Sequence, residues 1–226
     1  MNRVIPALAM SFCLAPFSVL QAADIELKTE KDKLSYAIGL ITAQQWKQQG
    51  IEVNADVIAA VVDDIQSGNT PQLSETEVRA ALDNFQNQRQ EKAKLASDEN
   101  KAEGAAFLAK NKENDGVVET DSGLQYQIVE AGEGENPAAS DSVTVHYRGT
   151  LLDGTEFDSS YSRGQPATFP LNGVIAGWTE GVQLVKPGGK IKLFIPSDLA
   201  YGDRGAPPTI KPGATLIFDV ELISIN

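Results

Sequence analysis

The spacing of hydrophobic residues changes near residue 115. Before that point apolar residues recur every three or four positions, for example at Leu34, Ala37, Ile38 and Ile41, as they do along one face of a helix. After it, apolar and polar residues alternate in short runs separated by Gly, Pro and Asp, as they do in strands joined by turns. The pattern therefore predicts an α+β protein in which an all-α N-terminal part precedes an antiparallel sheet.

Three helices are predicted before residue 115. Residues 32–49 form the first, and Asn54 caps a second that ends near Gly68. The third begins at Ser74-Glu75-Thr76-Glu77, where the Ser and the second Glu have the spacing of a capping box. The helices before Gln86 are too few to bury their own apolar faces in a monomer, because small domains expose much of the surface they would need to hide. These faces predict a symmetric homodimer that pairs through the first two helices.

The third helix loses its apolar stripe at Gln86 and is rich in Gln, Lys, Glu and Ala from there to Asn114. Good helix formers without an apolar face are typical of a helix that crosses solvent between domains. A continuous helix over residues 75–114 spans roughly 60 Å, and Gly104 is its expected weak point or bend. A disordered charged linker is the alternative, but the interleaved signs of charge favour the helix.

Five strands and one short helix are predicted after residue 115. The strands are expected at 117–120, 124–131, 142–152, 190–196 and 215–225. The helix is expected at about 176–184, before a Pro-Gly-Gly turn. An antiparallel sheet wrapped on one short helix is a half-barrel, and it leaves a cleft where strand ends and loops meet. We expect the aromatic residues near the strand ends to converge there, namely Tyr147, Phe157, Trp178, Tyr201 and Phe218.

Residues 1–23 have the pattern of a secretory signal peptide. A short start with Arg3 precedes a mostly apolar run, and small residues ending at Ala23 offer a cleavage site. A membrane anchor is the alternative, but residues 4–20 contain two prolines and are short for a span of roughly 20 residues. Cleavage removes Cys13 and both Met residues, which suits a mature chain without a membrane span in an oxidising compartment. We expect the periplasm, with the outer membrane surface and the cell exterior as alternatives.

The composition disfavours several classes of function. The formal net charge is -12, and loss of residues 1–23 removes one Arg and no acid, so the mature chain is more acidic still. An acidic chain repels phosphate backbones, so nucleic acid is not an expected partner. The chain has one His, no Cys outside the signal peptide, no His-Glu-x-x-His motif and no glycine-rich phosphate loop. We therefore expect no metal ion and no cofactor, and a structural or exposed role for His146.

Five motifs occur in order in the second half of the chain. They are Val145-His146-Tyr147, 154–160, Val174-Ile175-x-Gly177-Trp178-x-Glu180-Gly181, Ala200-Tyr201-Gly202 and 214–222. In this order they resemble the FKBP-type peptidyl-prolyl cis-trans isomerase domain over about residues 117–226. Residues 32–39 and 122–126 and the long polar helix are similar to the secreted bacterial Mip and FkpA-like members. The resemblance implies a V-shaped homodimer with chaperone activity, divided into a signal peptide (1–23), a helical dimerisation and chaperone domain with a linker helix (24–115) and an isomerase domain (116–226).

The resemblance also implies an activity and a site. The activity is cis-trans isomerisation of X-Pro bonds during the folding of exported proteins, which needs no nucleophile because its barrier is the loss of amide resonance. Carried over position by position, the catalytic residues are Phe157, Asp158, Trp178 and Tyr201, and the substrate-binding residues are Tyr147, Val174, Ile175 and Phe218. Trp178 would be the floor under the proline ring. The backbone N–H of Ile175 and the hydroxyl of Tyr201 would hold substrate carbonyls, and Arg163 would support Asp158.

Two positions depart from the eukaryotic pattern of this family. Ala167 stands where an aromatic wall is common and Ala206 where a His is common, so a more open rim is expected. Single aromatic residues belong to the core more often than to a site, and Phe169 and Tyr126 are interpreted in that way. The alternative function is a holdase chaperone whose FKBP-like domain only binds proline-containing peptides. Under either interpretation the partners are unfolded or folding proteins with exposed X-Pro bonds.

Overall fold

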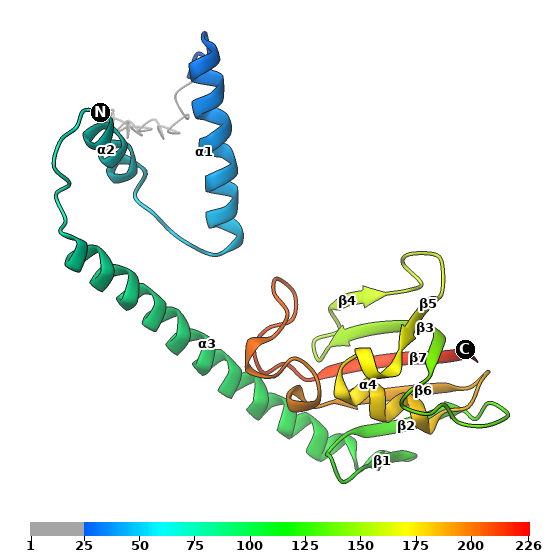
Figure 1. Ribbon diagram of the computed structural model, residues 1–226. Coiled ribbons are helices and arrows are strands. Elements are labelled where there is room, and N and C mark those ends of the chain that lie inside the picture. The colour runs from blue at the N-terminus through cyan, green and yellow to red at the C-terminus, as the bar shows by residue number, and fades with distance from the viewer. Residues whose placement is uncertain (1–24) are drawn as a thin grey trace, which may run out of the picture. The chain divides into compact units, whose positions relative to one another are not determined.

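The computed structural model describes residues 25–226, so the predicted signal peptide lies outside the described residues. The chain divides between Ala59 and Ala60 into two compact units. Three helices come first along the chain (Figure 1), namely α1 (Glu30–Gln48), α2 (Ala55–Gln66) and α3 (Glu75–Asn111). The three helices predicted from the sequence are therefore confirmed, with bounds that differ by a few residues.

Each helix begins where the sequence provides a cap. The Thr29 hydroxyl accepts from the N–H of Asp32 at 3.1 Å, and the Asp32 carboxylate accepts from the N–H of Thr29 at 2.8 Å. Asn54 caps α2 through its side-chain oxygen. Ser74 and Glu77 form the predicted capping box at the start of α3. These bonds satisfy backbone N–H groups that have no partner within the helix, so they define where each helix starts.

The apolar residues of α1 and α2 are exposed in the single chain. Neither helix buries a residue, and Ile41 in α1 and Ile65 in α2 expose 66% and 58% of their surface. Scattered exposed apolar residues are common in proteins, but two helices without any buried residue are not expected to be stable alone.

Seven strands follow α3 and form one antiparallel sheet in the order β1-β2-β6-β7-β3-β4, with β5 paired to β3. The strands are β1 (Val117–Glu119), β2 (Gln125–Glu130), β3 (Ser142–Leu151), β4 (Glu156–Ser159), β5 (Ala167–Pro170), β6 (Lys190–Ile195) and β7 (Leu216–Ile225). The five predicted strands are confirmed. The sequence did not predict β4 and β5, because runs of four residues are too short to establish an alternating pattern.

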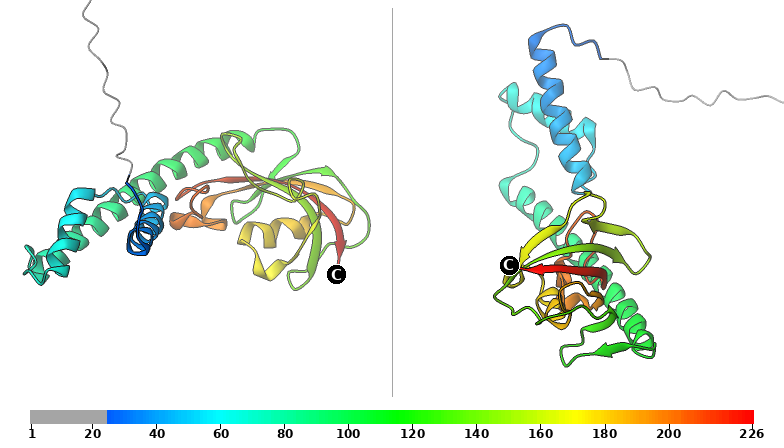
Figure 2. Two further views of the ribbon diagram at one scale, coloured as in Figure 1. Left: turned by 90° about the horizontal axis from the view of Figure 1, so that it is seen from above. Right: turned by 90° about the vertical axis from the view of Figure 1, so that its right-hand side faces the viewer.

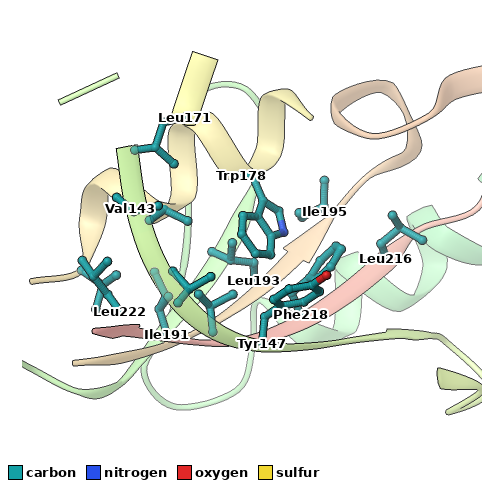
Figure 3. Close-up of a cluster of buried hydrophobic side chains, with 14 of the residues drawn as sticks. Val143, Tyr147, Leu171, Trp178, Ile191, Leu193, Ile195, Leu216, Phe218 and Leu222 are labelled. Carbon is teal, nitrogen blue, oxygen red and sulfur yellow. The ribbon is translucent and has the colours of Figure 1, made fainter. Parts of the chain in front are cut away.

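One short helix, α4 (Ala176–Gly181), packs on one face of the sheet and continues as a 3-10 turn at Val182–Leu184. Leu193 and Ile195 of β6 lie on this face, and the buried core lies between the sheet and α4 (Figure 3). Phe194 lies between them in sequence and points to the opposite face, where its ring is 6.0 Å from that of Phe107 in α3. The sheet is therefore covered by α4 on one face and by the end of α3 on the other (Figure 2). This confirms the predicted half-barrel.

The long helix α3 is exposed over its first half only. No residue over 75–92 is buried even in part, whereas Ser97, Gly104 and Asn111 are buried against the sheet and its loops. Asn111 donates to the side-chain oxygen of Gln125 at 2.9 Å, and Gln125 donates to the carbonyl of Leu108 at 2.9 Å. The helix runs through Gly104, the expected weak point or bend, without a break. Gly104 instead allows close packing, and the expectation of a helix surrounded by solvent applies only to the first half.

Candidate functional site

An apolar recess lies between α4, the strand ends and the loop that follows Tyr201. It has a volume of about 680 Å³. Its lining residues are Tyr147, Phe157, Asp158, Phe169, Gly173, Val174, Ile175, Trp178, Tyr201, Ile210 and Phe218. A recess of this size, mainly apolar and with few polar groups, is suited to a small ring and its flanking backbone.

Trp178 forms the base of the recess because two glycines bring α4 onto the sheet. A Cβ atom at Gly177 would lie 2.4 Å from Ile195, and one at Gly181 would lie 2.5 Å from Leu193. With only hydrogen at these positions, the helix backbone approaches β6 directly. Trp178 lies on the same helix between these glycines, and only 4% of its surface is exposed.

Aromatic rings stand around the indole nearly at right angles. The ring centroids of Tyr147 and Phe218 are both 5.2 Å from that of Trp178, with interplanar angles of 90° and 82°. Phe157 in turn meets Phe218 edge to face at 5.4 Å. Edge-to-face pairs are the preferred aromatic geometry, so the rings hold one another in place. Gly149 on β3 makes room for this cluster, because a Cβ there would lie 2.6 Å from Phe157.

The polar side of the recess is a cluster of Asp158, Tyr147 and Arg163. The Tyr147 hydroxyl donates to Asp158 at 2.5 Å, and Arg163 donates both to Asp158 and, at 2.7 Å, to the Tyr147 oxygen. The guanidinium carbon also lies 5.4 Å from the centroid of the Tyr147 ring. Asp158 comes from β4 and Tyr147 from β3, so the cluster joins two neighbouring strands at the edge of the recess.

The cluster sets the charge of each member. Burial alone would raise the pKa of Asp158, but the hydrogen bonds from Tyr147 and Arg163 and the Arg163 charge outweigh it, so the pKa lies below its ordinary value. Burial and the bond to Asp158 raise the pKa of Tyr147, although Arg163 acts in the opposite direction. Asp158 is therefore a carboxylate and Tyr147 a neutral phenol near neutral pH.

Several hydrogen-bonding groups of the lining residues make no hydrogen bond to the protein within residues 25–226, and one of them is the buried Nε1 of Trp178. Within residues 25–226, neither the backbone N–H of Ile175 nor the hydroxyl of Tyr201 makes a hydrogen bond to the protein. Ile175 precedes α4 with an extended backbone, and Tyr201 exposes 42% of its surface. Ile175 and Tyr201 both line the recess.

The structure brings together all eight residues to which the family resemblance assigns roles. It also adds two side chains that sequence reasoning missed. Phe169 was interpreted as core, yet it lines the recess with its ring 5.7 Å from Trp178. In the structure, half-buried Ala167 and Phe169 alternate with exposed Thr168 and Pro170 along β5, but a run of four residues is too short for the sequence to indicate this. Ile210 is the only large aliphatic residue between Tyr201 and Pro212, which could have indicated its inward position.

The remaining predicted positions lie beside the recess. Ala167 and Ala206 are not among its lining residues, and Ala206 instead pairs with Ile210 in a bridge that shapes the loop. His146 stacks on Tyr161 at 4.7 Å, and its Nδ1 lies 3.0 Å from the Ser160 hydroxyl. These contacts support the structural role expected for His146.

Comparisons with known proteins identify similarities over both parts of the chain. Residues 133–223 match the model of the FKBP-type peptidyl-prolyl cis-trans isomerase, and residues 31–128 match that of the domain amino terminal to FKBP-type peptidyl-prolyl isomerase. The chain is 45% identical over 218 residues to the outer membrane protein MIP of Legionella longbeachae, covering 94% of each chain. It is 42% identical over 204 residues to the peptidyl-prolyl cis-trans isomerase Mip of Coxiella burnetii, covering 88% of this chain and 89% of that protein.

A solved structure extends the similarity to the fold. The crystal structure of FkpA from Escherichia coli matches with a TM-score of 0.62 and 41% identity, covering 89% of this chain and 99% of that chain. Both the helical N-terminal part and the sheet with its helix are therefore shared with a solved protein.

Proposed function

Because this chain belongs to the FKBP-type peptidyl-prolyl cis-trans isomerase family, we propose that it isomerises X-Pro bonds in the recess above Trp178. Membership establishes the reaction, and the proposal concerns where and how it occurs. A single observation carries it, namely that one apolar recess is lined by all eight residues with an assigned role.

The recess suits a reaction that needs neither nucleophile nor proton donor. The barrier of roughly 18–20 kcal/mol is the resonance lost when the C–N bond twists. A planar amide is more dipolar than a twisted one, so an apolar surrounding raises the energy of the planar forms more. Groups that hold the twisted form better than either planar form then accelerate exchange between the two isomers.

Each side chain has a defined task in this mechanism. The proline ring lies on Trp178, and Tyr147, Phe157 and Phe218 form the walls, with Val174 beside the entrance. The N–H of Ile175 and the hydroxyl of Tyr201 bind the carbonyls that flank the ring. Their lack of protein partners supports this role, because both remain available for the substrate.

Asp158 supplies the electrostatic part of the mechanism. As the C–N bond twists, the carbonyl carbon loses electron density that the nitrogen had donated, and a fixed carboxylate stabilises the more positive carbon. Arg163 and Tyr147 hold Asp158 in one orientation, so little reorganisation is needed during the reaction.

Replacement of Trp178 tests the proposed site. We expect Trp178→Ala to lower kcat/KM on a proline-containing peptide by at least about tenfold, because it removes the floor of the recess. Trp46→Ala is the matched control, since Trp46 is the other tryptophan and lies in α1. If the parent protein is no faster than Trp178→Ala, the recess only binds proline-containing peptides, and the alternative of a holdase chaperone is favoured.

The helical part is proposed to serve as the dimerisation and chaperone domain. We assign it residues 24–115 and assign the isomerase domain residues 116–226. The apolar faces of α1 and α2 are exposed in the single chain, and pairing of two copies through these helices would bury them. The dimer would then hold unfolded or folding clients with exposed X-Pro bonds.

Export to the periplasm is proposed from the N-terminal pattern at residues 1–23 and from a relative named as an outer membrane protein. None of the helices in residues 25–226 has the length and apolar character needed to span a bilayer. Mass spectrometry of the protein from the producing cell tests cleavage after Ala23, and a full-length mass would contradict it.

A further inference from the structure

The second half of α3 bears a stripe of small and polar residues that contacts the rim of the recess. Ser97, Asn100, Lys101 and Gly104 have the spacing i, i+3, i+4 and i+7, so they share one face of the helix. This face lies against residues 201–215, which we call the rim segment. The second half of α3 and the orange loop that contains most of the rim segment are neighbours in Figure 1.

Hydrogen bonds hold both ends of the rim segment on the helix. The Ser97 hydroxyl donates to Asp203 at 2.7 Å, and the Lys101 ammonium lies 2.7 Å from the same carboxylate oxygen. Near the other end, the Asn100 side chain donates to the carbonyl of Pro212 at 2.7 Å. Ser97 is only 1% exposed, whereas the Asp203 side chain exposes 72% of its surface, so the contact is buried on the helix side and open to solvent on the side of the rim segment.

Two glycines allow the backbones of helix and segment to touch. A Cβ at Gly104 would lie 2.1 Å from the hydroxyl oxygen of Thr215. Gly213 has a φ of +73°, and a Cβ there would lie 2.4 Å from the carbonyl oxygen of Ser97. The contact is thus both polar and closely packed, which limits the positions that the rim segment can adopt.

The rim segment carries two of the residues that line the recess, Tyr201 and Ile210. Ala206 and Ile210 exchange two backbone hydrogen bonds of 2.8 and 3.1 Å, and the N–H of Gly213 donates to the carbonyl of Gly202 at 2.9 Å. The rim segment is therefore held together by its own backbone hydrogen bonds. A displacement of its ends from α3 would move Tyr201 and Ile210 together.

We propose that Ser97, Asn100, Lys101 and Gly104 are positioning residues for the isomerase reaction, acting through the rim segment on Tyr201 and Ile210. This inference rests on the proposed function of the recess. Release of the segment lowers the fraction of molecules in which Tyr201 and Ile210 are in place, and substrate restores their arrangement when it binds. The effect falls on KM, because a smaller binding-competent fraction weakens apparent affinity without changing the bound state.

The test uses the full chain and measures kcat and KM separately on a proline-containing peptide. We expect the double variant Ser97→Ala/Lys101→Met to raise KM about threefold to tenfold with kcat nearly unchanged. Lys101→Arg keeps the charge and is expected to retain a KM close to that of the parent. Lys92→Met is the matched control, because Lys92 is exposed on the same helix outside the contact with the rim segment.

Amide hydrogen exchange provides a readout specific to the rim segment. In the double variant, the amides of residues 202–213 should exchange faster while those of β6 keep the rate of the parent. Faster exchange with unchanged KM and kcat would overturn the positioning role, and unchanged exchange would overturn the anchoring itself. Trp178→Ala in the same assay separates the two proposals. If Trp178→Ala is as active as the parent, the proposed site is wrong and the positioning role is wrong with it. If Trp178→Ala loses activity, the proposed site stands, and the KM of Ser97→Ala/Lys101→Met decides the positioning role.

Discussion

At the scale of single residues, the proposed site contains one carboxylate, that of Asp158, on whose pKa burial and hydrogen bonding act in opposite directions. Burial disfavours the charge of Asp158, while the Tyr147 hydroxyl and the Arg163 guanidinium favour it and prevail. The folded-state pKa of Asp158 therefore lies below its unfolded value of about 3.9. A group with a lowered pKa stabilises the fold above the unfolded pKa, and this contribution disappears as the pH falls through the folded pKa.

Because the pKa of Asp158 is lowered in the folded state, Asp158→Asn should lose stability to an extent that depends on pH. The amide keeps the shape of the side chain but cannot form the charged contacts, so the variant should be less stable than the parent at pH 7. Near pH 3 the difference in unfolding free energy between parent and variant should be smaller. At this pH the carboxylate of the unfolded parent is largely protonated, so the stabilisation that comes from the lowered pKa of Asp158 is partly lost. Denaturant unfolding of both proteins at the two pH values measures it. An equal difference at pH 7 and pH 3 would contradict the assigned pKa direction.

At the scale of secondary-structure elements, the absence of side chains at two glycines allows α4 to pack directly on β6. Gly177 and Gly181 remove the Cβ atoms that would separate the helix from Leu193 and Ile195, and Trp178 is carried to the base of the recess. Adding a methyl group at Gly177 would gain up to about 1 kcal/mol of helix propensity. Overpacking against Ile195 is expected to cost about 1–3 kcal/mol, so the steric effect prevails.

Gly177→Ala should therefore destabilise the protein and also lower kcat/KM, because a shifted α4 displaces Trp178. Ile195→Ala creates the space that the added methyl group needs, so the cost of the double variant should be smaller than the sum of the two single costs. Denaturant unfolding and peptide turnover measure the two effects. Strict additivity of the unfolding free energies would show that Gly177 and Ile195 are not in contact.

The elements also show what the sequence could reveal. The helices and the five longer strands were predictable, because their periodicity and caps are local features of the chain. The family resemblance placed eight residues at one site, and these residues do line one recess. The docking face of α3 was not predictable, since Ser97, Asn100, Lys101 and Gly104 are typical of a solvated surface. Such a face is buried by hydrogen bonds and backbone contact rather than by apolar side chains, and the partners are more than 100 residues away in the chain.

At the scale of the whole molecule, the proposed catalytic site and the proposed dimer interface consist of different residues. All residues that line the recess lie between Tyr147 and Phe218 of one chain, so under the proposed function we expect isomerisation of a short peptide not to require a second copy. The exposed apolar residues of α1 and α2 have no role in that recess. A change on their apolar faces should therefore alter assembly while the chemistry on short peptides stays the same.

Val61→Asp tests this separation. Val61 is an exposed apolar residue of α2, and a charge there would remain desolvated in the proposed dimer interface. Light scattering should give the mass of a dimer for the parent and a mass shifted towards the monomer for the variant. We expect kcat/KM on a proline-containing peptide to stay within about twofold of the parent, and protection of an unfolded client from aggregation to fall.

Ala59→Asp is the matched control, because helical spacing places residue 59 on the side of α2 away from the apolar stripe, which consists of Val57, Ile58, Val61, Val62 and Ile65. It introduces the same charge in the same helix and should leave the dimer intact. A parent protein that scatters as a monomer at micromolar concentration would contradict the proposed assembly. A dimer that survives Val61→Asp would instead exclude this face of α2 from the interface, since a buried unpaired carboxylate costs too much for the contact to persist unchanged.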